Sequence, residues 1–384
     1  MARRLIVIYH EDFKSHAIDS VNHPESPRRL DLALESVGYV RSVAPKRSFK
    51  VTGAPRGSLD AFSRVHKPQY FEFAKSLVSS RRVDWIDSDT YVSRGTLDAL
   101  TRLVGSSHKA VSLALRGVNS FILGRPPSHH AGASGKAMGA PTMGFCIFNA
   151  TALIASILSD HGRVAVVDFD VHHGNGTQDI FYRDPRVLHI DIHADPSIAY
   201  PGTGYPDDVG EREAAGTKVN IVVPSMAGDD IYMDALRLVD AILASWKPDY
   251  IVASAGFDAY RGDNEAVLMN VGTRFYYAIG RILASRAKAV VSVLEGGYGA
   301  GLDRALKAYM LGLLRTRNWP WDPPSYSSSL AWKLYRHYRL ATITNIVKYG
   351  KILLPEELTA KALAKLRPKT GRRVRRKRKF RRYI

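Results

Sequence analysis

Residues 163–178 read RVAVVDFDVHHGNGTQ. The run from Arg163 to Val171 is apolar, rich in β-branched residues and followed by a glycine-rich turn, which is typical of a buried parallel strand. Runs of the same kind recur at Arg4–Tyr9, Ser120–Leu123, Val187–Ile192, Val219–Val223, Tyr250–Ala255 and Ala289–Leu294. These seven runs predict the strands of one sheet.

Helix-compatible stretches separate the predicted strands. They are Ser26–Ser36, Thr96–Leu115, Phe148–Leu158, Asp230–Ala244 and Val271–Ser285. Strands that alternate with helices predict an α/β protein with a doubly wound, mostly parallel sheet and helices on both faces.

The C-terminal part of the chain differs from the rest in composition. Residues 319–329, WPWDPPSYSSS, predict a loop, so we expect one domain over 1–318 and a loop with a helical extension over 319–366. Residues 367–384 hold 11 Lys or Arg and no acid, which leaves +8 of the formal charge of +19 for the other residues. This stretch predicts a solvated, disordered tail. Contact with nucleic acid or an anionic surface is the alternative.

Composition limits the class of protein. With 45% hydrophobic and 24% charged residues in 384, the chain is typical of soluble globular proteins. The single cysteine, Cys146, excludes an intramolecular disulfide and a cysteine-based metal cluster, which fits a reducing compartment. No stretch approaches the ~18 apolar residues of a membrane span, so we expect a cytoplasmic protein.

Polar residues gather just beyond the predicted strands. In an open parallel sheet, ligands bind beyond the carboxyl ends of the strands. His129 and His130 follow one strand, Asp168, Asp170 and His172 another, Asp258 a third and Tyr298 a fourth. We therefore expect these side chains to share one site.

The carboxylates and the histidine indicate a metal. Asp168, Asp170 and His172 alternate at every second residue, so on an extended chain they project from one face. Buried carboxylates are costly unless they are paired or bind a metal. Together with Asp258 they suit Zn²⁺, with Fe²⁺ as second choice. The alternative is that Asp168 and Asp170 only cap helices or order loops.

A hydrolytic site also needs groups that move protons. Zinc lowers the pKa of a coordinated water to about 7. His129 and His130 are candidates for the acid and base. Asp168 could orient one ring and Asn175 the other. The two histidines should titrate differently, since Asp stabilises an imidazolium by charge and a neutral Asn does so less. Tyr298, between two glycines, can donate to an oxyanion. Taken singly, His-His and Gly-Gly-Tyr are more often structural.

These segments together resemble the histone deacetylase and acetylpolyamine amidohydrolase family. The motifs are RPPSHHAG, GFCIFNA, VDFDVHHGNGTQDIFY, YPGTGY, SAGFDAYRGD and LEGGYG, with HPESPRRL and FSRVHKPQYF before them. They run in consistent order from about Tyr9 to Tyr298. The asparagine of HHGNGTQ resembles the class II branch.

The resemblance implies the arginase-deacetylase fold and hydrolysis of an N-acetyl amide to acetate and an amine. It implies zinc on Asp170, His172 and Asp258. It also implies that His130 is the general base and acid, that His129 assists electrostatically and that Tyr298 polarises the carbonyl.

The resemblance further implies a substrate tunnel. Phe145 and Tyr200 match its walls, with Gly144 beside them, and Asp89 matches a substrate-orienting carboxylate. The family also often binds K⁺ through backbone groups of Asp168, Asp170 and His172. Two residues depart from the pattern: Ser128 stands where glycine is usual, and Asp191 stands where serine is usual, which predicts an altered second cation site.

The substrate stays open among acetyl-lysine in proteins, an acetylpolyamine and another small N-acyl amine. Glu265, seven residues after Asp258, matches the glutamate of the polyamine-selective branch. The alternative is that Glu265 lies in the first turn of a helix capped by Asp263. Oligomeric state is not predicted.

Other classes fit the sequence less well. A serine hydrolase of the α/β type would need a G-x-S-x-G motif, which the sequence lacks. A ureohydrolase needs a two-metal carboxylate set and would leave GGY and the RPP-HH segment unexplained. A non-catalytic module on the same fold, tethered to nucleic acid, would be expected to have lost a ligand, the histidines or the tyrosine, and the sequence retains them all.

Overall fold

The computed structural model describes residues 4–18, 22–263, 268–316 and 322–366. Its centre is an eight-stranded sheet in the order β2-β1-β5-β10-β9-β6-β7-β8, and every pairing between these strands is parallel. The strands are β1 (Leu5–Tyr9), β2 (Phe49–Gly53), β5 (Asn119–Ile122), β6 (Val164–Asp168), β7 (Val187–Ala194), β8 (Lys218–Val223), β9 (Tyr250–Ala255) and β10 (Ala289–Leu294).

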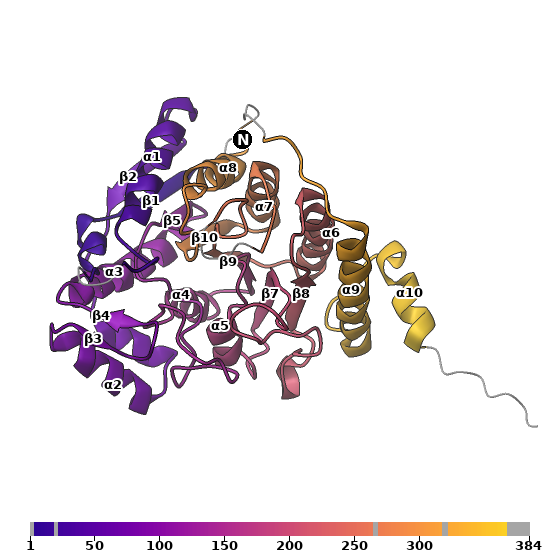
Figure 1. The fold of residues 1–384 in the computed structure, drawn as a ribbon, viewed down its shortest axis with the longest axis horizontal. Helices are drawn as coiled ribbons and strands as arrows, with labels where there is room; N and C mark the ends of the chain where they lie inside the picture. Colours follow the sequence, from indigo (N-terminus) through magenta and orange to yellow (C-terminus); the bar gives the residue numbers. More distant parts are fainter. Residues whose placement is uncertain (1–3, 19–21, 264–267, 317–321, 367–384) are drawn as a thin grey trace, which may run out of the picture.

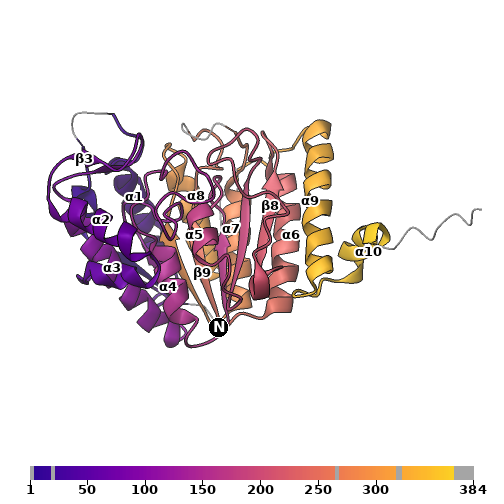
Figure 2. The same cartoon turned by 90° about the horizontal axis from the view of Figure 1, so that it is seen from below.

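Helices cover both faces of this sheet (Figures 1 and 2). One face carries α1 (Arg28–Val43), α6 (Asp229–Trp246), α7 (Thr273–Arg286) and α8 (Leu302–Leu314); the other carries α3 (Thr96–Leu115), α4 (Ala150–Leu158) and α5 (Asn175–Ile180). Further from the sheet lie α2 (Pro68–Ser79) and the short antiparallel pair β3 (Asp84–Trp85) and β4 (Tyr91–Val92). The predicted doubly wound α/β fold is confirmed.

Burial explains why the central strands are easily recognised in the sequence. Every residue of β6, β9 and β10 is buried, because helices cover both sides. Strands covered on both faces are continuously apolar rather than alternating. The edge strand β2 is half exposed, and its sequence, FKVTG, gave no such signal.

One predicted boundary is wrong at the most important strand. β6 ends at Asp168, so Asp170 and His172 lie in the loop that follows and not on an extended strand to Val171. The peptide N–H groups of this loop bond to carboxylates: Asp170 N donates to Asp168 Oδ1 at 3.1 Å, and His172 N donates to Asp170 Oδ1 at 3.0 Å. These bonds replace the strand ladder.

The segment after residue 321 packs against the edge of the sheet. Helix α9 (Ser329–Tyr349) lies along β8 and α6, and α10 (Glu356–Leu366) packs on α9 (Figure 2). Tyr335, Ile343 and Ile346 of α9 join the hydrophobic core. The domain boundary at 318 stays a prediction, and the basic tail 367–384 lies outside the described residues. Within the described part, no helix is both long and apolar enough to cross a membrane.

Candidate active site

Predicted site residues lie in the loops that follow four adjacent strands at the middle of the sheet. β5, β10, β9 and β6 are neighbours, and their carboxyl ends lead to His129 and His130, to Tyr298, to Asp258 and to Asp170. Residues from four segments that are 40 or more positions apart in the chain therefore meet at one rim.

Asp170, His172 and Asp258 form a compact cluster. The Nδ1 atom of His172 lies 3.1 Å from Asp170 Oδ1 and 3.1 Å from Asp258 Oδ2. Both aspartates are fully buried, whereas the His172 side chain is 18% exposed. Asp258 Oδ2 accepts no hydrogen bond of good geometry from any described residue. An imidazole and two carboxylates, one with a buried oxygen lacking a donor, fit a Zn²⁺ ion.

The charges of this cluster act strongly on each other. Burial would raise the pKa of Asp170, but His129 and His172 beside it hold that pKa well below its usual range. Burial and the Asp170 charge raise the pKa of Asp258 to about 7. Burial alone would lower the pKa of His172, yet Asp170 and Asp258 raise it to about 10. A divalent cation would have to displace the proton held here.

Backbone packing also leaves room for the carboxylates. A Cβ atom on Gly296, in the loop after β10, would lie 2.2 Å from Asp258 Oδ2 and 2.5 Å from Asp170 Oδ2. Only glycine lets this loop approach, and its N–H donates to Asp170 Oδ2 at 2.7 Å. The glycines of EGGYG therefore shape the cluster as well as the turn.

His129 and His130 lie side by side with different partners. Their ring centroids are 4.0 Å apart. His129 Nδ1 is 3.0 Å from Asp168 Oδ2, and His130 Nδ1 is 2.7 Å from Asn175 Oδ1. Burial opposes the charged form of both, but Asp168 and Asp170 raise the pKa of His129 well above 6.5. Burial and the neighbouring His129 lower the pKa of His130 well below 6.5.

Tyr298 is held by a hydrogen bond from its peptide N–H to Asp263 and by contact of its ring with a buried arginine. The N–H groups of Tyr298 and Gly299 donate to Asp263 Oδ2 at 2.7 and 2.8 Å. The guanidinium of Arg29 lies 4.6 Å from the centre of the phenol ring, and its Nε donates to Gly297 O at 2.7 Å. Burial raises the pKa of Tyr298 well above its usual value, so the hydroxyl stays protonated.

A cavity of about 140 Å³ opens beside these groups. It is lined by Asp89, His130, Gly144, Phe145, His172, Tyr200 and Tyr298. Tyr200 packs edge-on to His130, with ring centroids 5.0 Å apart, and Phe145 packs edge-on to Tyr298 at 5.7 Å. Aromatic walls with few polar groups suit an alkyl chain. Four of the five predicted substrate residues line this cavity; the fifth, Glu265, lies outside the described residues.

Close packing fixes the position of Gly144 in the wall. A Cβ atom there would lie 2.5 Å from the His130 ring, and the residue has a positive φ of 54°. The next residue, Phe145, donates its N–H to Thr90 Oγ1 at 3.0 Å, and Thr90 donates to Asp89 Oδ1 at 2.7 Å. Burial raises the pKa of Asp89.

Of a supporting network behind this site, sequence reasoning singled out Ser128 alone, as a departure from the family pattern. Glu25 is fully buried and accepts from Arg29 Nη1 at 3.1 Å and from Arg125 Nη2 at 2.6 Å. Glu295 accepts from Ser128 N at 2.5 Å and Ser128 Oγ at 2.6 Å. The hydroxyl of Ser128 thus donates a hydrogen bond to the buried carboxylate of Glu295. Besides Ser128, the charged residues of the motif HPESPRRL, Glu25 and Arg29, were the available sign of this network in the sequence.

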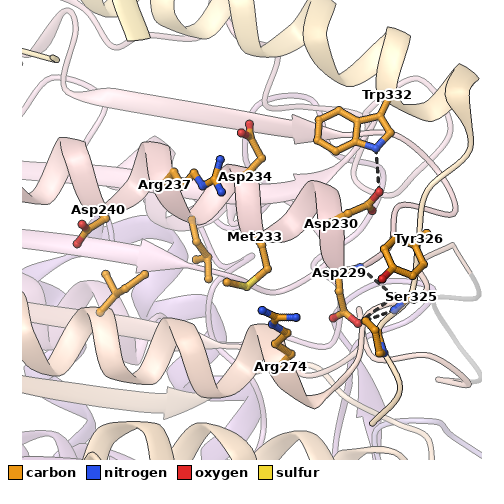
Figure 3. Close-up of a pocket in the computed structure, with 13 residues that line it drawn as sticks. Asp229, Asp230, Met233, Asp234, Arg237, Asp240, Arg274, Ser325, Tyr326 and Trp332 are labelled. Carbon is orange, nitrogen blue, oxygen red and sulfur yellow. Dashed lines mark hydrogen bonds between the residues drawn. The ribbon is translucent and has the colours of Figure 1, made fainter. Parts of the chain in front are cut away.

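A larger cavity lies away from this chemistry. It measures about 540 Å³ and lies between α6, α7 and the segment that leads into α9. Figure 3 shows Asp230 accepting from Trp332 Nε1, at 2.8 Å, and Asp229 accepting from Ser325. Three of its four aspartates anchor the C-terminal segment, and none of the predicted site residues lines it.

Comparison with known proteins agrees with this geometry. Residues 23–313 match the model of the histone deacetylase domain. The chain belongs to the histone deacetylase family. It is 31% identical over 345 residues to a probable deacetylase of Archaeoglobus fulgidus. The alignment covers 85% of this chain and 91% of that protein. As a member of this family the chain is an enzyme, a hydrolase of amide bonds, and the family is typically metal-dependent.

Two solved structures share the fold. The HD domain of HDA15 superposes with a TM-score of 0.79 at 28% identity, over 94% of this chain and 99% of that one. An acetylpolyamine aminohydrolase from Burkholderia pseudomallei superposes with a TM-score of 0.70 at 25% identity, over 80% of this chain and 98% of that one. The predicted arginase-deacetylase fold is confirmed.

Proposed function

We propose that this deacetylase is a cytoplasmic, zinc-dependent enzyme that hydrolyses the acetyl amide of acetyl-lysine or of an acetylpolyamine. The observation that carries the proposal is that His130, His172 and Tyr298 line one cavity of about 140 Å³, and that Asp170 and Asp258 cluster with His172. Asp170, His172 and Asp258 would hold the ion. When bound, zinc supplies a Lewis acid that polarises the amide carbonyl and acidifies water.

His130 is the residue suited to take the proton from the attacking water. Its low pKa keeps the ring neutral near pH 7. Asn175 Oδ1 can only accept, so His130 Nδ1 carries the hydrogen and Nε2 is left free as the base. The same Nε2 then returns the proton to the leaving amine nitrogen as the C–N bond breaks, giving acetate and a free amine.

His129 has the opposite electrostatic character. Its Nδ1–H donates to Asp168 Oδ2, and its raised pKa keeps the ring charged. A fixed imidazolium 4.0 Å from the His130 ring keeps His130 deprotonated and stabilises negative charge that develops in the transition state. We assign His129 to electrostatic assistance.

Tyr298 is positioned to donate to the carbonyl oxygen. Tyr298 lines the cavity with its hydroxyl protonated, and Asp263 and Arg29 fix its peptide and its ring. A hydrogen bond aimed at a developing oxyanion contributes about 10²–10³ in rate.

The cavity supports an alkyl-amine substrate. Phe145 and Tyr200 supply apolar walls, and Asp89 lies at the same cavity as an acceptor for a polar group of the substrate. Both candidate substrates present the same acetylated alkyl amine. They differ beyond the cavity, where a polyamine carries a second ammonium and a peptide carries neutral amides.

The test is an acetate-release assay of the zinc-loaded full chain on acetylspermidine and on an acetyl-lysine peptide, side by side. We expect turnover of at least one substrate. A strong preference for acetylspermidine that is lost in Glu265→Leu assigns the polyamine class; preference for the peptide assigns the protein class. Activity on neither would overturn the proposal.

A further inference from the structure

The loop that follows β7 carries one wall of the substrate cavity. β7 ends at Ala194, and Tyr200, six residues later, lines the cavity. The Tyr200 ring packs edge-on to His130, with centroids 5.0 Å apart, and its hydroxyl donates to Thr142 O at 3.0 Å. The position of Tyr200 therefore sets how closely this wall approaches the candidate base and the segment that carries Gly144.

Asp195 organises the turn between β7 and Tyr200. Its Oδ1 atom accepts hydrogen bonds from Ser197 N at 2.9 Å and from Ser197 Oγ at 2.7 Å. Its carbonyl oxygen accepts from the N–H groups of Ile198 and Ala199, both at 3.1 Å. A displacement of Asp195 would therefore move the turn that leads directly into Tyr200.

A side chain of α9 holds the other oxygen of this carboxylate. Tyr338 Oη donates to Asp195 Oδ2 at 2.7 Å. Burial and the Asp195 carboxylate raise the pKa of Tyr338 to about 12, so the phenol stays a donor at neutral pH. Further along the helix, Asn345 Nδ2 donates to Pro206 O at 2.8 Å. Helix α9, which runs beside β8 (Figure 2), therefore bonds to the loop between β7 and β8 at its start and near its middle.

Other side chains of α9 make the helix a fixed support. Tyr335, Ile343 and Ile346 are buried in the core, and Tyr335 Oη donates to Asp234 Oδ2 of α6 at 3.0 Å. Tyr335 and Tyr338 lie within one turn of each other and make the same kind of bond, from a phenol to a carboxylate. Their partners differ, because one bond attaches the helix to α6 and the other reaches the loop.

We propose that Tyr338 is a positioning residue for substrate binding, which acts through Asp195 to fix the loop that carries Tyr200 and thus the cavity wall. This inference rests on the proposed function. Tyr338 is not among the described residues that line the cavity, so its effect on the substrate has to pass through Tyr200. Helix α9 follows residues 23–313, the part of the chain that matches the deacetylase domain. The C-terminal extension would therefore help to shape the substrate site as well as cover the edge of the sheet.

Kinetics of Tyr338→Phe measure the effect on substrate binding. The zinc-loaded full chain is assayed by acetate release on acetylspermidine and on the acetyl-lysine peptide. A loosened wall weakens binding without changing His130 or Tyr298. KM should therefore rise about two- to tenfold, the range that one hydrogen bond supplies, while kcat stays within about twofold and zinc content is unchanged.

Tyr335→Phe is the matched control on the same helix. It should lower the Tm, as Tyr338→Phe does, but leave KM unchanged, because the bond it removes goes to α6. A KM raised equally in both variants, or in neither, would overturn the positioning role.

A double-mutant cycle tests the route through Tyr200. Tyr200→Ala removes the ring and should raise KM by itself. If Tyr338 acts by placing that ring, Tyr338→Phe should raise KM no further in the Tyr200→Ala background. Two independent effects that multiply would show that Tyr338 does not act through Tyr200, and the proposal would fail.

Hydrogen exchange tests the support of the loop without any turnover. The amides of Ile198 and Ala199 bond to Asp195 O, and the amide of Gly202 bonds to Ala199 O. These amides should exchange faster in Tyr338→Phe and at the unmodified rate in Tyr335→Phe. Unchanged exchange over 195–202 in Tyr338→Phe would contradict the inference. If the unmodified enzyme turned over neither substrate, the proposed function would fail, and the exchange rates would still decide whether Tyr338 fixes this loop.

Discussion

Two cavities of this enzyme both contain aspartate and tyrosine side chains, but they differ in whether the polar groups beside them all have hydrogen-bond partners. The cavity at α6 and α7 is larger, about 540 Å³, and holds four aspartates. Three of these accept hydrogen bonds from the segment leading into α9 or from α9 itself, and Asp240 pairs with Arg286 at 2.6 Å. Each carboxylate has an ordinary partner.

The cavity at the ends of the central strands is smaller, about 140 Å³. Beside it lie a carboxylate oxygen without a hydrogen bond from the described part of the chain and two histidines with different charge states. Asp258 Oδ2 accepts no hydrogen bond from a described residue, and two adjacent histidines have pKa values moved in opposite directions. Paired groups pushed apart in pKa beside a cavity are typical of catalysis, whereas satisfied carboxylates are typical of packing. Volume alone would have selected the wrong cavity.

The largest expected difference between the cavities is at their carboxylates. Asp258→Asn should lose the metal and lower turnover by about 10³-fold or more, because metal polarisation supplies several kcal/mol and each 1.36 kcal/mol is tenfold. Zinc content and acetate release measure both effects. The matched control, Asp240→Asn, should keep zinc and turnover. Comparable losses in both variants would remove the distinction drawn between the cavities.

Tyrosines in the two cavities give the next comparison. Tyr298→Phe should lower kcat about 10²–10³-fold while zinc stays bound, because only the donor to the oxyanion is lost. Tyr326, which lines the larger cavity and is 74% exposed, provides the control as Tyr326→Phe, with kcat unchanged. Near-normal kcat in Tyr298→Phe would exclude the phenol from the mechanism.

The pH dependence tests the opposed histidines. A base whose pKa lies well below 6.5 is deprotonated at neutral pH, so kcat/KM should fall only when acid protonates His130. Asn175→Asp places a carboxylate at Nδ1, which favours the imidazolium and should move this acid limb to higher pH. His130→Ala should remove the limb and most turnover with zinc retained. An acid limb that stays in place in Asn175→Asp would mean that another group sets it.

Much of the active cavity could be predicted from the sequence, for a physical reason. β6, β9 and β10 are covered on both faces and therefore appear as apolar runs, and the parallel sheet brings whatever follows them to one rim. Asp170, Asp258 and Tyr298 could be placed at the site because each follows one of the predicted strands. The groups that hold them did: Arg29 and Asp263 act through contacts between segments far apart in the sequence.

The larger cavity and its helix were harder to predict. Of the 21 residues of α9 only five are buried, Ala331, Tyr335, Thr342, Ile343 and Ile346, so the helix shows little amphipathic pattern. Besides these core contacts, its attachment depends on the Trp332 indole and the Tyr335 hydroxyl, which donate to aspartates of α6. Such polar contacts have no periodicity in the sequence, and the extension was expected only as a loop followed by a helical segment.

Asp230 gives the smallest expected effect and the sharpest contrast. It accepts from Ser327 N at 3.0 Å and from Trp332 Nε1 at 2.8 Å, and these bonds, opposing its burial, lower its pKa. Asp230→Ala should therefore cost about 1.5–3 kcal/mol of stability, because it removes hydrogen bonds to a charged group. Since the native pKa is the lower one, this contribution is present above the ordinary Asp pKa and is lost as the pH falls through the native value.

Thermal unfolding at pH 7 and at decreasing pH measures this contribution, and kcat/KM at 25 °C measures function. Asp230→Ala should lower the Tm by a few degrees and leave kcat/KM unchanged, and the difference in Tm should shrink in acid. Asp207→Asn, at an exposed carboxylate without a side-chain hydrogen bond among the described residues, should change neither. If Asp230→Ala lowered kcat/KM by tenfold or more at full folding, the larger cavity would be coupled to the chemistry, and satisfied carboxylates would no longer separate a packing cavity from an active one.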